Sequence, residues 1–172
     1  MTYTLDGSLV NKNNLQKHVK WHSSEHIPTA YAQTNKDYLH SYYDRGHMAP
    51  DASFDYDITS LKTTYTYGAN SIPQASLVNR HGWTDVELRA RELAVKHNYV
   101  NVINIIKYSK STIGNGVRVP SDLYKLIYIT NDIRECYHYT NTNDACDNKH
   151  GVESHRVNCG SIYYGEEDID NE

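Results

Sequence analysis

The chain has 172 residues and a mass of 19.8 kDa, which is long enough for one domain and short for two. Its formal net charge of −4 argues against a generic basic protein that coats nucleic acid. The charge is uneven, because residues 1–120 carry 13 basic and 10 acidic side chains, whereas residues 121–172 carry 4 and 11. We therefore expect an anionic partner to meet the first two-thirds of the chain.

Transmembrane and export signals are absent from the sequence as given. No stretch approaches 18 consecutive apolar residues, so neither a transmembrane helix nor a membrane partner is expected. The first ten residues lack the basic and apolar regions of a signal peptide, which still leaves room for a mature secreted form.

The first forty residues contain one clear structural signal. Residues 3–5 and 8–10 read as the two strands of a hairpin, because the Asp6-Gly7 pair between them suits a tight turn. Residues 11–40 are polar and are expected to be irregular.

The clearest helix is expected over residues 84–98, where apolar residues recur at helical spacing. The run over 99–106 is rich in β-branched residues and predicts a strand, as does the run over 123–130. Glycines at 114 and 116 indicate a turn between them. These elements predict an α+β fold with a mixed, mostly antiparallel central sheet and flanking helices.

One domain over residues 1–164 accounts for these elements. The acidic tail over residues 165–172 is poor in apolar side chains and is expected to fray.

Four consecutive residues, Asp44-Arg45-Gly46-His47, carry the strongest chemical signal. Histidine suits general-base catalysis near neutral pH, and the planar guanidinium of arginine suits a phosphate group. The glycine would allow an unusual backbone conformation. The alternative is a strand end with a solvent-exposed histidine.

A second stretch adds Asn70-x-x-Pro73-Gln74, then Asn79 nine residues after Asn70, and Glu87 eight residues after Asn79. With the first motif, this pattern closely resembles the DNA/RNA non-specific endonucleases of the ββα-metal superfamily. The resemblance runs from about residue 5 to residue 126. It implies a ββα-metal catalytic motif over residues 43–97.

The resemblance also implies roles for individual residues. His47 would be the general base that activates water, and Asn79 would be the single protein ligand of a Mg²⁺ ion, with Mn²⁺ or another divalent ion as a substitute. A lone amide oxygen fits Mg²⁺, which retains several of its waters. Glu87 and Asp44 would hold metal-bound waters, and Arg45 would contact the phosphate.

The implied reaction is hydrolysis of DNA and RNA without sequence selection, giving 5′-phosphate and 3′-hydroxyl ends. Asn70 would position His47 or the scissile group. Apart from the resemblance, Arg80 is a candidate for a surface that follows the phosphates, and the alternative is an ordinary surface charge. Family members carry an upstream arginine, for which Lys20 is the candidate here, although a lysine lacks the bidentate contact of arginine. A homodimer is a further expected partner, because homodimers occur in this family.

Each assignment has a structural alternative. Glu87 has the spacing of the N3 residue of a helix capping box that starts at Thr84. Asn70 and Asn79 also suit turns. Asp44 also suits a surface ion pair. Lys20 reads equally well as a solvated loop residue.

Three histidines and three cysteines remain. On a helix, His18, His22 and His26 would share one side and suit Zn²⁺, but the surrounding sequence favours three exposed histidines. Related bacterial nucleases are similar in having cysteines near Cys136 and Cys159, which implies a disulfide, and the alternative is that all three cysteines, with Cys146, are reduced.

Two broader expectations follow from the resemblance. Exported nucleases are common in this family, so a secreted or periplasmic location is expected. The alternative to an active nuclease is a catalytically weak or silent relative that binds nucleic acid.

Overall fold

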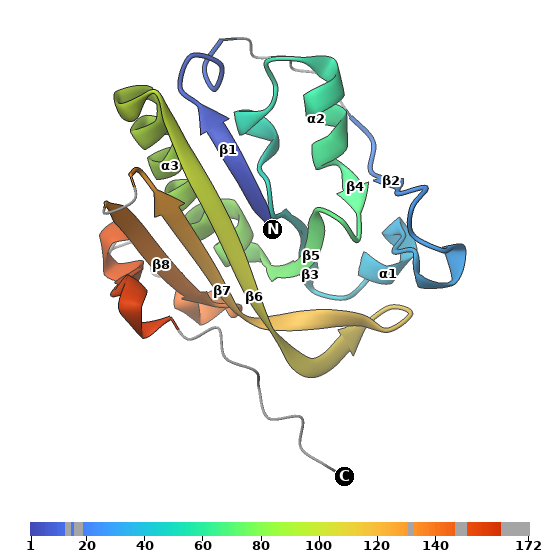
Figure 1. Cartoon of the computed structure of the whole chain (residues 1–172). Helices are drawn as coiled ribbons and strands as arrows, with labels where there is room; N and C mark the ends of the chain where they lie inside the picture. The colour runs from blue at the N-terminus through green and yellow to red at the C-terminus, as the bar shows by residue number, and fades with distance from the viewer. Residues whose placement is uncertain (13–14, 16–18, 131–132, 147–150, 163–172) are drawn as a thin grey trace.

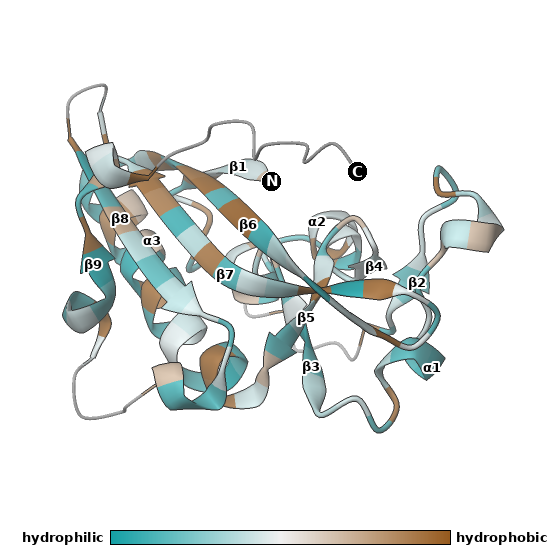
Figure 2. Cartoon of the chain, turned by 90° about the horizontal axis from the view of Figure 1, so that it is seen from below, coloured by the Kyte–Doolittle hydropathy of each residue, from teal (hydrophilic) through white to brown (hydrophobic). Residues whose placement is uncertain are grey.

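The structure is a computed structural model that describes residues 1–12, 15, 19–130, 133–146 and 151–162. A five-stranded antiparallel sheet forms its centre, in the order β1-β6-β7-β8-β9, and Figures 1 and 2 together label all five strands. The strands are β1 (Thr2–Asp6), β6 (Tyr99–Ile113), β7 (Val117–Tyr128), β8 (Arg134–Thr140) and β9 (Arg156–Val157). The predicted α+β class is therefore confirmed.

Strands β6 and β7 form a long hairpin that projects beyond the rest of the sheet (Figure 1). Both predicted strands are confirmed, but β6 continues to Ile113 and β7 already begins at Val117. Gly114 and Gly116 take positive φ values of 49° and 84° in the connecting turn, a conformation that glycine adopts without strain.

The predicted hairpin at the start of the chain is wrong. Its first strand exists, but β1 pairs with β6, and residues 7–10 form turns. The Asp6 carboxylate accepts hydrogen bonds from the amide and hydroxyl of Ser8. Gly7 lies so close to the backbone of Ala94 that a Cβ atom would approach its oxygen to 2.2 Å. The chain therefore turns against a helix where the sequence indicated a second strand.

That helix, α3 (Trp83–His97), confirms the predicted helix and packs against β1 and β6. Its predicted capping box is wrong, because a π-helical turn over Val78–Gly82 runs directly into it. Thr84 is therefore inside the helix, where its hydroxyl donates to the carbonyl of Asn79 at 3.0 Å. Glu87 is consequently not a helix-capping residue.

Residues 11–40 are mostly irregular where the structure describes them, but they include short elements. Strand β2 (His22–Ser23) pairs in parallel with β4 (Thr66–Tyr67). Helix α1 (Asn35–Tyr38) begins after Thr34, and the Asp37 carboxylate caps it.

A second, two-stranded sheet lies beside the first. Strand β3 (Tyr43–His47) runs antiparallel to β5 (Ser71–Ala75), and helix α2 (Ile58–Thr64) lies on the connection between them. Strand β5 packs against β7, and the chain passes from β5 into α3. This order places two antiparallel strands and one helix in succession around the motif residues.

Apolar side chains fill both faces of the central sheet, and apolar bands cross β6 and β7 in Figure 2. The larger cluster lies under α3 and includes Val86, Ala90 and Leu93 from its predicted stripe. The smaller cluster contains Leu126 and Cys136.

Cys136 on β8 forms a disulfide with Cys159, and Cys146 is a buried free thiol. The acidic tail over 165–172 lies outside the described residues. Among the helices that the structure describes, none is long and apolar enough to cross a membrane.

Candidate active site

The residues of the first motif form strand β3, and their register on β5 sets their positions. His47 lies opposite Ser71, Arg45 opposite Pro73, and Asp44 opposite Gln74. Gly46 is not there for a positive φ, as the sequence suggested. It is there for space, because a Cβ atom would lie 2.0 Å from Oε1 of the buried Gln74 side chain.

His47 has an aromatic surround. Its imidazole lies 4.6 Å from the ring of Trp21 and 4.8 Å from that of Tyr65, measured between centroids. Its Nε2 atom is buried and has no hydrogen-bond partner among the described residues. Burial lowers the pKa of His47, Asp51 opposes that shift, and Arg45 adds to it. The imidazole is therefore neutral near pH 7, which is the form a general base needs.

Arg45 lines an open cavity beside this histidine. Its Nη1 atom donates to Asn35 Oδ1 at 2.7 Å and to the Tyr67 hydroxyl at 3.1 Å, and its guanidinium lies 5.9 Å from the Trp21 ring centroid. The cavity has a volume of about 340 Å³, and Asp44 and Asn79 also line it. A fixed cation in an open cavity of this size can receive a phosphate group.

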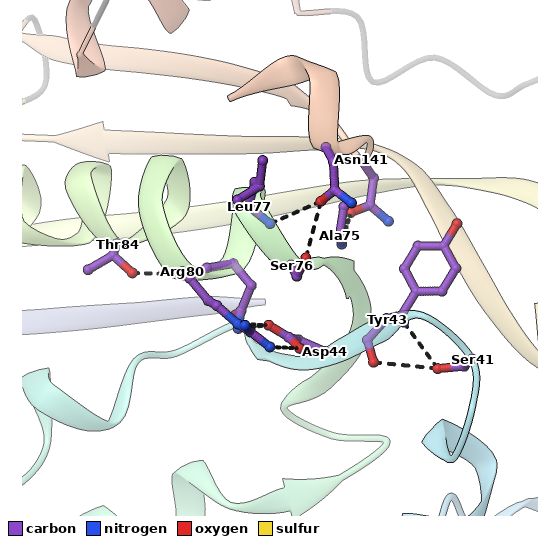
Figure 3. Close-up of polar contacts among 11 residues, drawn as sticks. Ser41, Tyr43, Asp44, Ala75, Ser76, Leu77, Arg80, Thr84 and Asn141 are labelled. Carbon is purple, nitrogen blue, oxygen red and sulfur yellow. Dashed lines mark hydrogen bonds and ion pairs between the residues drawn. The ribbon is translucent and has the colours of Figure 1, made fainter. Parts of the chain in front are cut away.

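Asp44 ties the first motif to the second (Figure 3). Arg80 donates to its carboxylate through Nε and Nη2, each at 2.8 Å, and Asn79 Nδ2 donates to it at 3.1 Å. Burial alone would raise the pKa of Asp44, but the bonds from Arg80 and Asn79 lower it below the usual range. Asp44 is thus an anion that fixes the orientation of the Asn79 amide.

The orientation of Asn79 bears on metal binding. Because Nδ2 is used by Asp44, Oδ1 is the atom left for another ligand, and no described residue donates to it. Nor do the described residues contain a group of three His, Cys, Asp or Glu that could hold an ion. A site with one amide oxygen and bound waters suits Mg²⁺, which dehydrates reluctantly. The residues present therefore fit the ion that the sequence predicts.

Glu87 lies half-buried on α3. Burial raises its pKa to about 7, although the positive charges of Lys125 and Arg91 lower it. Asp51 acts electrostatically on both Glu87 and His47, which places the three groups in one neighbourhood. No hydrogen bond links Glu87 to Asn79 or Asp44, so a role in holding waters stays a proposal.

Asn70 is buried, and its amide is fully engaged by the backbone. Its Oδ1 accepts from the Ala49 amide at 2.7 Å, and its Nδ2 donates to the carbonyls of Ala49 and Thr64. Both hydrogens of Nδ2 are used in this way, so Asn70 has no donor left for a phosphate, and its proposed role is to position the backbone next to His47.

The remaining predicted residues lie at the edge of this cluster or apart from it. Lys20 is exposed and makes no hydrogen bond or ion pair with the site residues that the structure describes. Arg80 is 64% exposed but is held by Asp44. His22 contacts Thr66 and His26 lies beside Glu25, with no helix to align them, and His18 falls outside the described residues. The described residues thus give no support to a zinc site.

A sequence model of DNA/RNA non-specific endonucleases matches residues 1–163. The chain belongs to this family.

Individual relatives show how far the similarity extends. Human mitochondrial nuclease EXOG is 31% identical over 125 residues, which is 65% of this chain and 34% of that protein. The mitochondrial nuclease of Saccharomyces cerevisiae is 29% identical over 136 residues, 70% of this chain and 41% of that protein. The chain spans about a third of the length of the curated relatives that it matches first.

A solved structure is similar throughout the fold. The endonuclease from a complex of EndoG with its inhibitor EndoGI superposes with a TM-score of 0.79 at 26% identity. The match covers 93% of this chain and 72% of that one.

The predicted secreted or periplasmic location is wrong. It rested on exported members of the DNA/RNA non-specific endonuclease family, whereas EXOG, the yeast nuclease and endonuclease G are named as mitochondrial. Family membership therefore does not indicate export for this chain.

Sequence reasoning missed the aromatic and acidic neighbours of His47. Trp21 and Tyr65 pack on its ring, and the Tyr65 hydroxyl donates to Asp51. Trp21 directly follows Lys20, the residue that the sequence offers as the counterpart of the family's upstream arginine. No periodicity or spacing identifies Tyr65 or Asp51.

Proposed function

We propose that this chain is a Mg²⁺-dependent endonuclease that hydrolyses phosphodiester bonds of DNA and RNA without sequence selection and leaves 5′-phosphate ends. One observation carries the proposal: a neutral His47 imidazole lies beside Arg45, and Arg45 lines one cavity together with Asn79, whose amide Asp44 orients. The proposed base and the phosphate-binding cation thus lie on β3, and the proposed metal-binding oxygen lies in the turn before α3.

In this mechanism the neutral His47 imidazole accepts a proton from the attacking water through one of its ring nitrogens. Arg45 orients the phosphate, and Asp44 holds Asn79 so that Oδ1 can bind the ion. Mg²⁺, when bound, stabilises the negative charge that develops on the phosphate and the leaving oxygen. None of these groups reads a base edge, so sequence selection is not expected.

Cleavage of supercoiled plasmid and of RNA tests this function. We expect cleavage with Mg²⁺, none with EDTA, and a rate at least about 100-fold lower for His47→Ala, because general-base catalysis typically contributes that much or more. His22→Ala is the matched control, since His22 is an exposed histidine outside the site. The 5′-phosphate ends should be ligated without prior kinase treatment.

Equal cleavage by His47→Ala, or indifference to EDTA, would falsify the mechanism. Retarded DNA on a gel without cleavage under any divalent ion would instead support a silent relative that binds nucleic acid.

A further inference from the structure

A lysine lies buried behind the strand that carries His47. Lys125 on β7 has no exposed surface, and its Nζ donates to Asn104 Oδ1 on β6 at 2.9 Å and to the Tyr3 hydroxyl on β1 at 3.1 Å. The same ammonium lies 4.3 Å from the ring centroid of Trp83. No described carboxylate lies within ion-pair distance of it. Burying a charge in this way costs free energy, and burial accordingly lowers the pKa of Lys125 to about 8.

Two neighbours of this lysine hold the backbone of the catalytic segment. The Asn104 Nδ2 donates to the carbonyl of Met48, and the Trp83 Nε1 donates to the carbonyl of His47 at 3.2 Å. The amide of Met48 donates to the Asn70 carbonyl at 3.0 Å. Two side chains and one backbone carbonyl, from three distant parts of the chain, therefore fix successive peptide groups at His47 and Met48.

The orientation of Asn104 depends on Lys125. An ammonium can only donate, so the Asn104 atom that faces it must be the acceptor Oδ1. The donor Nδ2 then faces the Met48 carbonyl. With an apolar side chain at position 125, the Asn104 Oδ1 would lose this donor, so the amide would be held less firmly against the Met48 carbonyl, and the Trp83 ring would lose the cation on its face.

We propose that Lys125 is a positioning residue for His47: through Asn104 and Trp83 it fixes the His47–Met48 backbone, and with it the direction of the imidazole. This inference rests on the proposed function, in which His47 is the general base. Lys125 itself touches no substrate, because it is completely buried. Its charge also lowers the pKa of Glu87 and so partly offsets the rise that burial causes.

If Lys125 only stabilised the fold, its replacement would change the free energy of unfolding and leave the activity of the folded protein unchanged. Replacing a buried charge with an apolar side chain of similar length is often neutral or stabilising for the fold. Lys125→Met therefore separates the two roles, since it should leave a folded protein with a misdirected base. Glu135→Gln is the matched control, because Glu135 on β8 is also buried and charged. Its carboxylate pairs with Arg89 on α3 at 2.7 Å and does not contact the His47 segment.

The first measurement needs neither metal nor substrate. In EDTA, Lys125→Met should speed hydrogen exchange at the amides of Met48 and Ala49 by at least about tenfold relative to amides of β8, whereas Glu135→Gln should leave these two unchanged. Unchanged exchange at Met48 and Ala49 in folded Lys125→Met overturns the proposal.

The second measurement uses kinetics. With the folded fraction measured, Lys125→Met should lower kcat by about 10- to 100-fold and leave KM unchanged, because small misplacements of catalytic groups have effects of this size. Asn104→Asp should do the same, because it keeps the acceptor for Lys125 and removes only the donor to Met48. If Lys125→Met fails to fold, Asn104→Asp carries both measurements alone.

The His47→Ala background gives the decisive comparison. There, single-turnover nicking should be unaffected by Lys125→Met or Asn104→Asp, since the group that they position is gone. An equal loss in both backgrounds, or no loss in either, overturns the positioning role. A wild-type chain that does not cleave, or a His47→Ala variant that cleaves normally, contradicts the proposed function instead, and the exchange experiment still decides whether Lys125 fixes this backbone.

Discussion

Asp44 is the residue on which the orientation of Asn79 depends. Its carboxylate accepts from Asn79 Nδ2 and from two nitrogens of Arg80, so the amide oxygen of Asn79 is left for the metal ion that we propose. Groups that orient a metal ligand typically change metal affinity 10- to 100-fold when they are lost. We therefore expect Asp44→Asn to raise the Mg²⁺ concentration for half-maximal cleavage by about tenfold or more, measured by titration of the ion.

Arg80→Gln is the control for that experiment. It removes the ion pair but leaves the Asp44–Asn79 hydrogen bond in place, so its effect on the Mg²⁺ requirement should be much smaller. Equal Mg²⁺ requirements for wild type and Asp44→Asn would show that Asp44 does not orient the ligand.

At the level of elements, the two motifs are one packed unit, because Gln74 of β5 fills the space above Gly46 of β3. Gly46→Ala would place a methyl group against the Gln74 side chain, and overpacking of this kind costs about 1–3 kcal/mol. We expect that loss in the free energy of unfolding, measured with urea, and a partial recovery in Gly46→Ala/Gln74→Ala. Gly160→Ala is the control, since its nearest neighbour would be 3.3 Å away. A Gly46→Ala variant as stable as wild type would remove this explanation of the motif.

The elements also show how far sequence reasoning reaches. Helix α3 and strands β6 and β7 were predictable, because periodicity and β-branched residues act locally. The motif residues could be named from their resemblance to a family pattern, and the structure places Asp44, Arg45 and His47 on β3 and Asn79 in the turn before α3. The partners that hold this segment could not be predicted, since Asn104 contacts Met48, and Lys125 contacts Asn104, from strands far along the chain. The false hairpin at Asp6-Gly7 has the same cause, because contact with α3 overrides the local turn signal.

For the whole molecule, the disulfide lies apart from the proposed catalytic unit. Cys136 and Cys159 pack in the smaller apolar cluster with Leu126, whereas Met48 and Trp83, which adjoin His47, belong to the cluster under α3. The bond joins residues 23 positions apart, and closing a loop of that length stabilises the folded state by about 3 kcal/mol in the chain-entropy model. Stability and catalysis should therefore respond differently to its loss.

We expect the Cys136→Ala/Cys159→Ala variant to lose about 2–4 kcal/mol in the free energy of unfolding, measured with urea under oxidising conditions. The kcat of its folded fraction should stay within about twofold of wild type, because the strand order keeps β8 and β9 at the edge opposite β1 and the hydrogen bonds around His47 do not involve them. Cys146→Ala is the matched control, since it removes a buried sulfur without opening a loop. A fall in kcat without loss of folded protein would show that the smaller apolar cluster supports the site. An unchanged free energy of unfolding would show that the disulfide does not restrain the unfolded chain.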